Sequence, residues 1–178
     1  MKHITDMLNE LVEREGGYSN RKADRGGPTN LGITLATLSE WRGRQCTIED
    51  IKNLTKEEAF RIYKYKYYVQ PKIDRLPAPI QEQVFDIGVN SGPATAVRLL
   101  QDVLNRLGIP CTVDGRIGPR TIRAAYNALE KFGTKDVSNA LVNRRIAFYQ
   151  AIVDNDKTGL QIQNINGWMN RAESFRHM

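Results

Sequence analysis

The sequence predicts a mainly α-helical protein with a small β-hairpin or ordered loop after its first helix. Apolar residues recur three and four positions apart through most of the chain, which is the spacing of one helix face. Over residues 3–15 this stripe consists of Ile4, Met7, Leu8, Leu11 and Val12. A stretch rich in Gly, Pro and Asn follows from residue 18 to 32. Such a stretch interrupts a helix and is long enough for a hairpin or loop.

Further helices are expected up to the C-terminus. A short helix is predicted over 34–41, and Thr47 is a candidate cap for the next one. Thr55 and Glu58 have the spacing of a capping box, which predicts a helix from there to about residue 67. Prolines are favoured at first helical positions. They stand near the starts of three more predicted helices, at Pro79, Pro93 and Pro119, and two last helices are predicted over 134–154 and 161–175.

The bulk composition limits the classes of protein. The 178 residues include 26 Lys and Arg against 20 Asp and Glu, a formal net charge of +6. This charge favours an anionic partner, although it also suits solubility alone. No apolar run is long enough for a transmembrane helix, so no stable membrane insertion is expected. The first residues lack the apolar core of a secretory signal, and we expect synthesis in the cytoplasm.

Histidine and cysteine are too scarce for several kinds of hydrolytic site. The two histidines, His3 and His177, stand at opposite ends of the chain, and the two cysteines are Cys46 and Cys111. A zinc site needs clustered ligands, and a Cys or Ser nucleophile needs a histidine within reach. We therefore expect no metal, no cofactor and two free thiols, which leaves carboxylate chemistry.

Glu15 breaks the pattern of the first predicted helix. The apolar stripe, continued by one step, reaches position 15, where the chain has a carboxylate followed by Gly16 and Gly17. Glycines at this point are typical of a helix end. We expect a partly desolvated carboxyl at the edge of the core, an environment that suits a general acid.

A second carboxylate, Asp24, follows nine residues after Glu15. Glycoside hydrolysis uses two carboxyl groups across a cleft, one to protonate the leaving oxygen and one to stabilise the cation, attack it or position water. Thr29 and Asn30 are polar groups that could hold such a water. Aspartate is also common in glycine-rich turns, so Asp24 is open to either interpretation.

The motifs of this segment resemble those of glycoside hydrolase family 108, whose members are N-acetylmuramidases, mostly phage endolysins. The resemblance rests on Glu15-Gly16-Gly17-Tyr18, Ala23-Asp24, Gly26-Gly27-Pro28-Thr29-Asn30 and Leu31-Gly32-Ile33-Thr34. It implies a lysozyme-like helical fold and Glu15 as the catalytic acid. The Glu-to-Asp spacing is similar to that of phage lysozymes with a Glu, Asp, Thr triad. That similarity implies catalytic roles for Asp24 and Thr29, and we expect Tyr18 and Asn30 to bind substrate.

A second stretch, Phe85-Asp86-Ile87-Gly88-Val89-Asn90-Ser91-Gly92-Pro93, resembles the family motif that lines the cleft. The resemblance implies substrate-binding roles for Asp86, Asn90 and Ser91, although a polar cluster at a helix end would have the same composition. Tyr65 and Tyr68 are the more exposed aromatics of the predicted helix and are candidates for sugar stacking. Phe60, Tyr63 and Tyr67 have core spacing and are interpreted as packing residues.

The C-terminal part, from Val113-Asp114-Gly115-Arg116-Ile117-Gly118-Pro119 to Gly167-Trp168-Met169-Asn170-Arg171, resembles a peptidoglycan-binding region. The first of these stretches also works as a plain turn before a helix that starts with proline. We therefore expect a catalytic region over 1–92 and a peptidoglycan-binding region over 93–178, packed as one globular unit.

Three functions remain after these exclusions. The first is a muramidase that hydrolyses the β-1,4 bond between N-acetylmuramic acid and N-acetylglucosamine and so lyses the bacterial cell wall. The second is a lytic transglycosylase, which needs one Glu and gives 1,6-anhydro products. The third is a basic helical nucleic-acid binder, which lacks a recognition motif. We expect an antimicrobial, monomeric phage endolysin that binds peptidoglycan and no nucleic acid, made in the host cytoplasm and released to the periplasm.

Overall fold

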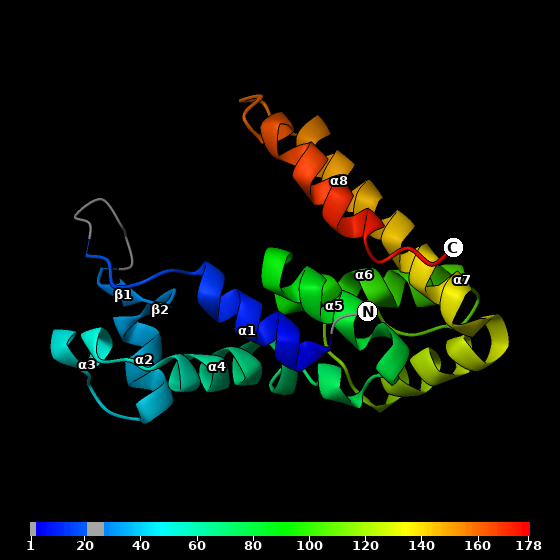
Figure 1. Ribbon diagram of the computed structural model, residues 1–178. Coiled ribbons are helices and arrows are strands. Elements are labelled where there is room, and N and C mark those ends of the chain that lie inside the picture. The colour runs from blue at the N-terminus through cyan, green and yellow to red at the C-terminus, as the bar shows by residue number, and fades with distance from the viewer. Residues whose placement is uncertain (1–2, 21–26) are drawn as a thin grey trace. The chain divides into compact units, whose positions relative to one another are not determined.

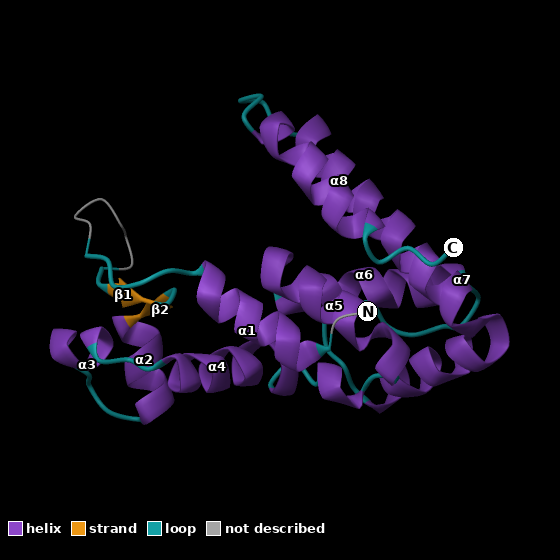
Figure 2. Ribbon diagram, in the orientation of Figure 1, coloured by secondary structure: helices purple, strands orange, loops and turns teal. Residues whose placement is uncertain are grey.

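The computed structural model describes residues 3–20 and 27–178, and Asp24 lies outside these ranges. The described chain is mainly helical with one small two-stranded sheet, which confirms the predicted fold class (Figures 1 and 2). The chain divides into two compact units, Met1–Val69 and Gln70–Met178. No helix among the described residues has the length and apolar character needed to cross a membrane.

The first unit holds four α-helices, the small sheet and a π-helix within its described residues. In chain order they are α1 (Ile4–Arg14), β1 (Thr29–Asn30), β2 (Ile33–Thr34), α2 (Leu35–Arg42), α3 (Ile48–Lys52), α4 (Lys56–Lys64) and the π-helix η1 (Tyr65–Val69). The apolar stripe of α1 is buried at Met7, Leu8, Leu11 and Val12, as its spacing predicts. Helix α1 packs against α4, which buries Ile62 and Tyr63.

The hairpin reverses direction over two residues. Thr29 pairs with Thr34 and Asn30 with Ile33, so the turn consists of Leu31 and Gly32 alone. Both turn residues have positive φ, 54° and 77°, as the tight two-residue turns of hairpins require. Glycine adopts this conformation freely, whereas leucine does so at a cost, so the surrounding contacts must hold Leu31 in place.

Threonine caps begin three helices of the first unit. Thr34, Thr47 and Thr55 each accept a hydrogen bond from the backbone N–H three residues later. The reciprocal capping box forms at Thr47, whose N–H donates to Asp50, rather than at the predicted Thr55. The carboxylate of Glu58 instead accepts from Arg42 of α2 at 2.6 Å, which ties α2 to α4.

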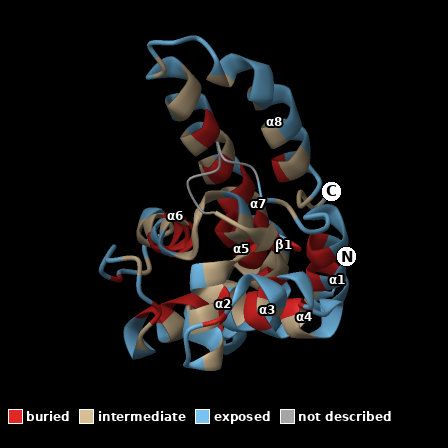
Figure 3. Cartoon of the chain, turned by 90° about the vertical axis from the view of Figure 1, so that its left-hand side faces the viewer, coloured by how far each residue is buried: buried red, intermediate tan, exposed pale blue. Residues whose placement is uncertain are grey.

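The second unit is built from long helices. They are α5 (Ala78–Ser91), α6 (Pro93–Arg106), α7 (Pro119–Asp154) and α8 (Ile165–Glu173), with short 3-10 turns η2 (Ile73–Arg75) and η3 (Gln161–Asn164). Gly133 interrupts α7 with φ of 83°, which confirms the expected new helix at residue 134. Helix α8 returns alongside the last part of α7, and Figure 3 shows exposed residues at the tip of this pair.

The segment from Asp114 to Thr121 is fixed by one buried side chain, Gln101 of α6. Its amide nitrogen donates to Asp114 Oδ1, the Arg116 carbonyl and Thr121 Oγ1, at 2.9–3.0 Å. Its amide oxygen accepts the backbone N–H groups of Asp114 and Gly115, both at 3.0 Å. These contacts give Asp114, Gly115 and Thr121 of the predicted peptidoglycan-binding motif a structural role in the turn before α7.

The compact units divide at residues 69 and 70, whereas the predicted regions divide at residues 92 and 93. The difference is helix α5, which packs against α6 and α7. The buried face of α5 thus belongs to the core of the second unit, and the division into functional regions stays a prediction.

Candidate active site

Glu15 is the C-cap residue of α1. Its backbone N–H still bonds to the Leu11 carbonyl, and Gly16 then leaves the helix with φ of 75°. The side chain is exposed, so the partial burial expected from the apolar stripe is not observed. The physical reason is that α1 ends at Arg14, so the stripe stops one residue before Glu15.

The Glu15 carboxyl lies directly on the turn of the hairpin. A Cβ placed on Gly32 would come within 2.9 Å of both Glu15 Cβ and Glu15 Oε2, and it would collide with the Tyr63 hydroxyl. Real Cβ atoms essentially never approach other atoms so closely. Gly32 is therefore required here both for its positive φ and for its missing side chain.

Tyr63 connects α4 to this turn. Its hydroxyl donates a 2.6 Å hydrogen bond to the carbonyl oxygen of Leu31, and its ring stacks on Tyr67 at 6.0 Å. The pKa of Tyr63 is raised, chiefly by burial and further by the negative charge of Glu15. The sequence pattern assigned Tyr63 to packing alone, and helical spacing contains no signal for a hydroxyl that reaches a turn 32 residues earlier.

The remaining aromatic candidates of the first unit differ in exposure. Tyr18 is exposed, and the ammonium of Lys52 lies 5.3 Å from its ring centroid, a cation–π distance. Tyr65 is exposed and lies 5.8 Å from Trp41, ring to ring. Tyr68 is half-buried. No local pattern in the sequence marks Trp41 as a site residue, because its exposure and its contact with Tyr65 arise only in the fold.

The two polar residues of β1 have partners within the hairpin region. Asn30 is buried, and its amide donates to the carbonyl oxygens of Ile51 and Lys52 at 2.9 and 3.2 Å. It thus holds the end of α3 against the hairpin. Thr29 is half-buried, and its backbone pairs with Ser19 in both directions at 2.8 Å, which brings the segment after Glu15 to the hairpin. The substrate-binding role of Asn30 and the catalytic role of Thr29 stay predictions.

Asp86, Asn90 and Ser91 lie together on the last turns of α5 in the second unit. Asp86 is buried, whereas Asn90 is exposed and donates to it at 3.4 Å. Ser91 is half-buried and is the last residue of the helix. These three residues are thus grouped as the motif predicts, and their roles toward substrate stay predictions.

The Asp86 carboxylate is enclosed by arginines from two other helices. Its Oδ2 accepts from Arg145 of α7 at 2.5 Å, and its Oδ1 accepts from both Nε and Nη2 of Arg171 of α8. Arg145 is itself fully buried, and its Nε donates to the Tyr149 hydroxyl at 2.8 Å. Asp86 therefore joins α5, α7 and α8 through charged hydrogen bonds. Arg171 belongs to the predicted peptidoglycan-binding motif, but no local pattern pairs it or Arg145 with Asp86, because they stand 85 and 59 residues away.

Metal ligands do not cluster in the part of the chain that the structure describes. Among residues 3–20 and 27–178, no group of three or more His, Cys, Asp or Glu side chains could hold an ion. Cys46 and Cys111 are buried free thiols, as expected. Among its described residues, the first unit thus presents the exposed carboxylate of Glu15 at the hairpin and exposed aromatic rings such as Tyr18 and Tyr65 elsewhere.

A carboxyl that lies beside a hairpin turn in a mainly helical protein is compatible with carboxylate-based glycoside hydrolysis. The comparisons with known proteins indicate the same chemistry. The glycosyl hydrolase 108 model matches residues 8–92, and the model described as a predicted peptidoglycan domain matches residues 95–173. The structure of SagA from Brucella abortus is 32% identical to this chain, with a TM-score of 0.64 over 97% of this chain and 95% of that one. A search of curated proteins found no similar sequence.

The chain therefore belongs to the glycosyl hydrolase 108 family and carries a peptidoglycan domain behind its catalytic part. It is a glycoside hydrolase that acts on peptidoglycan.

Proposed function

We propose that the protein is an N-acetylmuramidase that hydrolyses the β-1,4 bond between N-acetylmuramic acid and N-acetylglucosamine. The observation that carries this proposal is the exposed carboxyl of Glu15, which lies against Gly32 at the hairpin turn. A carboxyl at this position is open to solvent and can meet the glycosidic oxygen of an incoming glycan strand.

Glu15 acts as the general acid in this proposal. Its carboxyl proton passes to the glycosidic oxygen as the bond from that oxygen to the muramic acid C1 breaks. Water supplies the new oxygen at C1, and one water proton restores the acid, so the products are two sugar ends, one of them reducing. Asp24 is proposed as the second carboxylate, with Thr29 beside the attacking water.

The exposed aromatic side chains of the first unit are proposed to stack on sugar rings. Tyr18 and the pair formed by Tyr65 and Trp41 offer ring faces at the surface. The π-helix that carries Tyr65 supports this proposal, because π-helical turns are frequent at functional sites. Tyr68, on the same turn, is half-buried.

Mass spectrometry of the products tests the bond and the chemistry together. Purified peptidoglycan is digested with the protein, and the muropeptides are analysed before and after borohydride reduction. The proposal predicts reducible N-acetylmuramic acid ends. Reducible N-acetylglucosamine ends would assign the other glycosidic bond, and 1,6-anhydro ends would make the protein a lytic transglycosylase.

We separately propose, from the family resemblance, that the protein is a monomeric, antimicrobial phage endolysin that is made in the cytoplasm. The cytoplasmic origin is tested by expressing the chain in Gram-negative cells with and without a co-expressed membrane pore. Lysis only with the pore supports release from the cytoplasm. Lysis without the pore would show that the protein reaches the wall by another route.

A further inference from the structure

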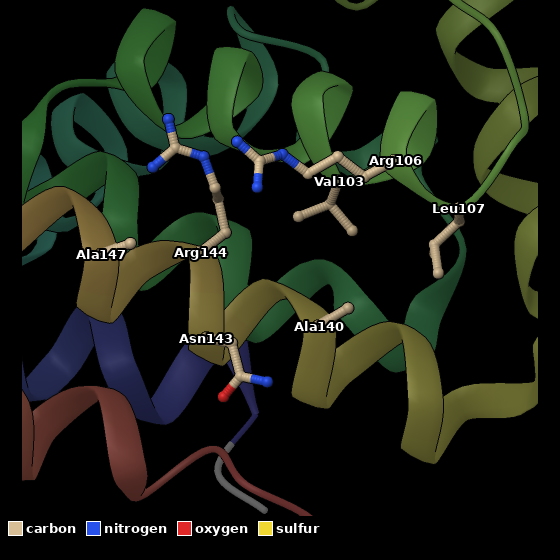
Figure 4. Close-up of a pocket in the computed structure, with 7 residues that line it drawn as sticks. All are labelled: Val103, Arg106, Leu107, Ala140, Asn143, Arg144 and Ala147. Atoms are coloured by element: carbon tan, nitrogen blue, oxygen red, sulfur yellow. The ribbon is translucent and has the colours of Figure 1, made fainter.

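A groove between α6 and α7 of the second unit is lined by apolar and cationic side chains, none of which belongs to the proposed glycosidase site. Its volume is about 260 Å³, and it lies within the region matched by the peptidoglycan domain (Figure 4). Its lining residues are Val103 and Arg106 of α6, Leu107 at the C-cap of α6, and Ala140, Asn143, Arg144 and Ala147 of α7.

Apart from its arginines and Asn143, the groove is lined by apolar residues, and the side chains that α7 adds to this lining are small. Ala140 and Ala147 stand seven residues apart on α7, and Val103 of α6 and Leu107, just after α6, complete the apolar lining. At these two positions α7 contributes only the methyl groups of alanine to the groove. The groove therefore suits small apolar groups such as methyls.

Two arginines supply the polar rim. Arg106 and Arg144 both bind Oδ2 of Asp102, through their Nε atoms, at 3.0 and 2.6 Å. Figure 4 shows the two guanidinium groups side by side above the groove. One carboxylate faces two guanidinium groups, so the rim keeps one positive charge. Among the described residues, no hydrogen bond engages the Nη atoms of either group, which leaves several donors for an external acceptor.

We propose that this groove binds the peptide stem of peptidoglycan, with a stem carboxylate on Arg106 and Arg144 and an alanine methyl on the apolar wall. The inference rests on peptidoglycan being the substrate. The peptide stem carries both free carboxylates and alanine methyl groups, whereas the lactyl carboxyl of the intact glycan strand is bound in the amide link to the stem and leaves the strand without a free carboxylate. Guanidinium nitrogens match a carboxylate in geometry and charge. The second unit would then hold the polymer by its peptides while the first unit cleaves its glycan.

Filling the groove is the sharpest test. In a Glu15→Gln background, which keeps the polymer intact, Ala147→Trp is compared with Ala151→Trp, an exposed position one turn further along α7. Binding is measured on Gram-negative sacculi and on stripped glycan, which is the same glycan after an amidase has removed its peptides and the lactyl carboxylates so exposed have been converted to methylamides. The indole of Ala147→Trp fills the groove, so binding to intact sacculi should weaken by about tenfold or more, a loss of about 1.4 kcal/mol. It should leave binding to stripped glycan unchanged, and Ala151→Trp should change neither.

Charge is tested with a second pair of variants. Arg106 and Arg123 are both exposed arginines on helices of this unit, but only Arg106 lines the groove. Arg106→Gln should weaken binding to intact sacculi, and Arg123→Gln, with the same change in net charge, should not. In competition, acetyl-D-alanyl-D-alanine should displace the protein, whereas inorganic phosphate at the same ionic strength should not.

Three results would overturn the inference. The first is equal binding by the two tryptophan variants, the second is an equal loss on stripped glycan, and the third is displacement by phosphate rather than by the dipeptide. If the groove does not bind the peptide stem, the wild-type protein should still hydrolyse peptidoglycan. Failure of the proposed function would instead appear as unchanged lysis by Glu15→Gln, so the two outcomes are distinguishable.

Discussion

Glu15 and Gly32 approach so closely that a Cβ on the glycine would lie 2.9 Å from the Glu15 carboxylate oxygen Oε2. The acid at the end of one helix and the turn of the hairpin therefore form one structural feature. The hydroxyl of Tyr63 closes the same feature from α4 by binding the carbonyl of Leu31 at 2.6 Å. The proposed acid is exposed, and its position depends on these neighbours rather than on burial.

Gly32→Ala should lower activity much more than its effect on stability explains. The new methyl meets the Glu15 carboxyl and the Tyr63 hydroxyl, so the acid must move. Gly43→Ala is the matched control, because Gly43 also has positive φ, 70°, but no atom within 4 Å of its Cβ position. The backbone cost of a left-handed alanine, about 1 kcal/mol, should be common to both variants. Thermal unfolding and initial rates of peptidoglycan hydrolysis measure the two effects, and equal activity in both variants would contradict the account.

Tyr63→Phe should destabilise the first unit by about 1–3 kcal/mol, because the Leu31 carbonyl loses its buried donor. The turn should then hold Glu15 less firmly, which lowers kcat more than it raises KM. Tyr126→Phe is the control, since Tyr126 is an exposed tyrosine of α7 with no proposed role in the site. Urea unfolding and steady-state kinetics test the pair. A Tyr63→Phe protein as stable and active as the control would remove Tyr63 from the site.

Alkaline pH should destabilise the wild type more steeply than the Tyr63→Phe variant. Burial and the charge of Glu15 raise the pKa of Tyr63 above its ordinary value of 10.0. Above that pH the unfolded chain loses the phenolic proton while the folded chain keeps it, so the unfolding free energy falls as pH rises. Below that pH the proton is bound in both states and this contribution is constant. Unfolding free energies measured on both sides of pH 10 should diverge between the two proteins, and parallel curves would refute the assignment.

Asp86→Asn should cost about 3–5 kcal/mol of stability, because it leaves the fully buried Arg145 without its counter-ion. Asp102→Asn is the comparison, because Asp102 also pairs with two arginines but is more exposed and should cost about 1 kcal/mol or less. Chemical denaturation measures both. The predicted substrate role of Asp86 is tested in the same variant: a raised KM with unchanged stability would place Asp86 at the substrate.

Local patterns in the sequence predict most of the helices. The apolar stripe of α1, the starts of α5, α6 and α7 at prolines in their first turns, and the break before residue 134 each follow from a few neighbouring residues. The exposure of Glu15 differs from expectation because an apolar stripe shows which face of the helix is buried but not whether the core extends as far as its last residue.

Contacts between distant segments explain what the sequence could not predict. The Tyr63 hydroxyl meets Leu31 across 32 residues, and Arg171 meets Asp86 across 85. Neither pair has a local pattern, because tyrosine at core spacing and arginine on a helix are both ordinary. The groove residues likewise come from two helices whose facing positions are set by packing.

The central claim is that Glu15 is the general acid, and the most direct test is the rate of peptidoglycan hydrolysis by Glu15→Gln. Glu13→Gln is the matched control, since Glu13 is an exposed glutamate of the same helix that pairs with Lys56 at 2.7 Å. Loss of a general acid predicts a fall in kcat of about 10²–10⁴-fold for Glu15→Gln, with unchanged unfolding and near-normal activity for Glu13→Gln. A Glu15→Gln protein that hydrolyses peptidoglycan at the wild-type rate would contradict the account.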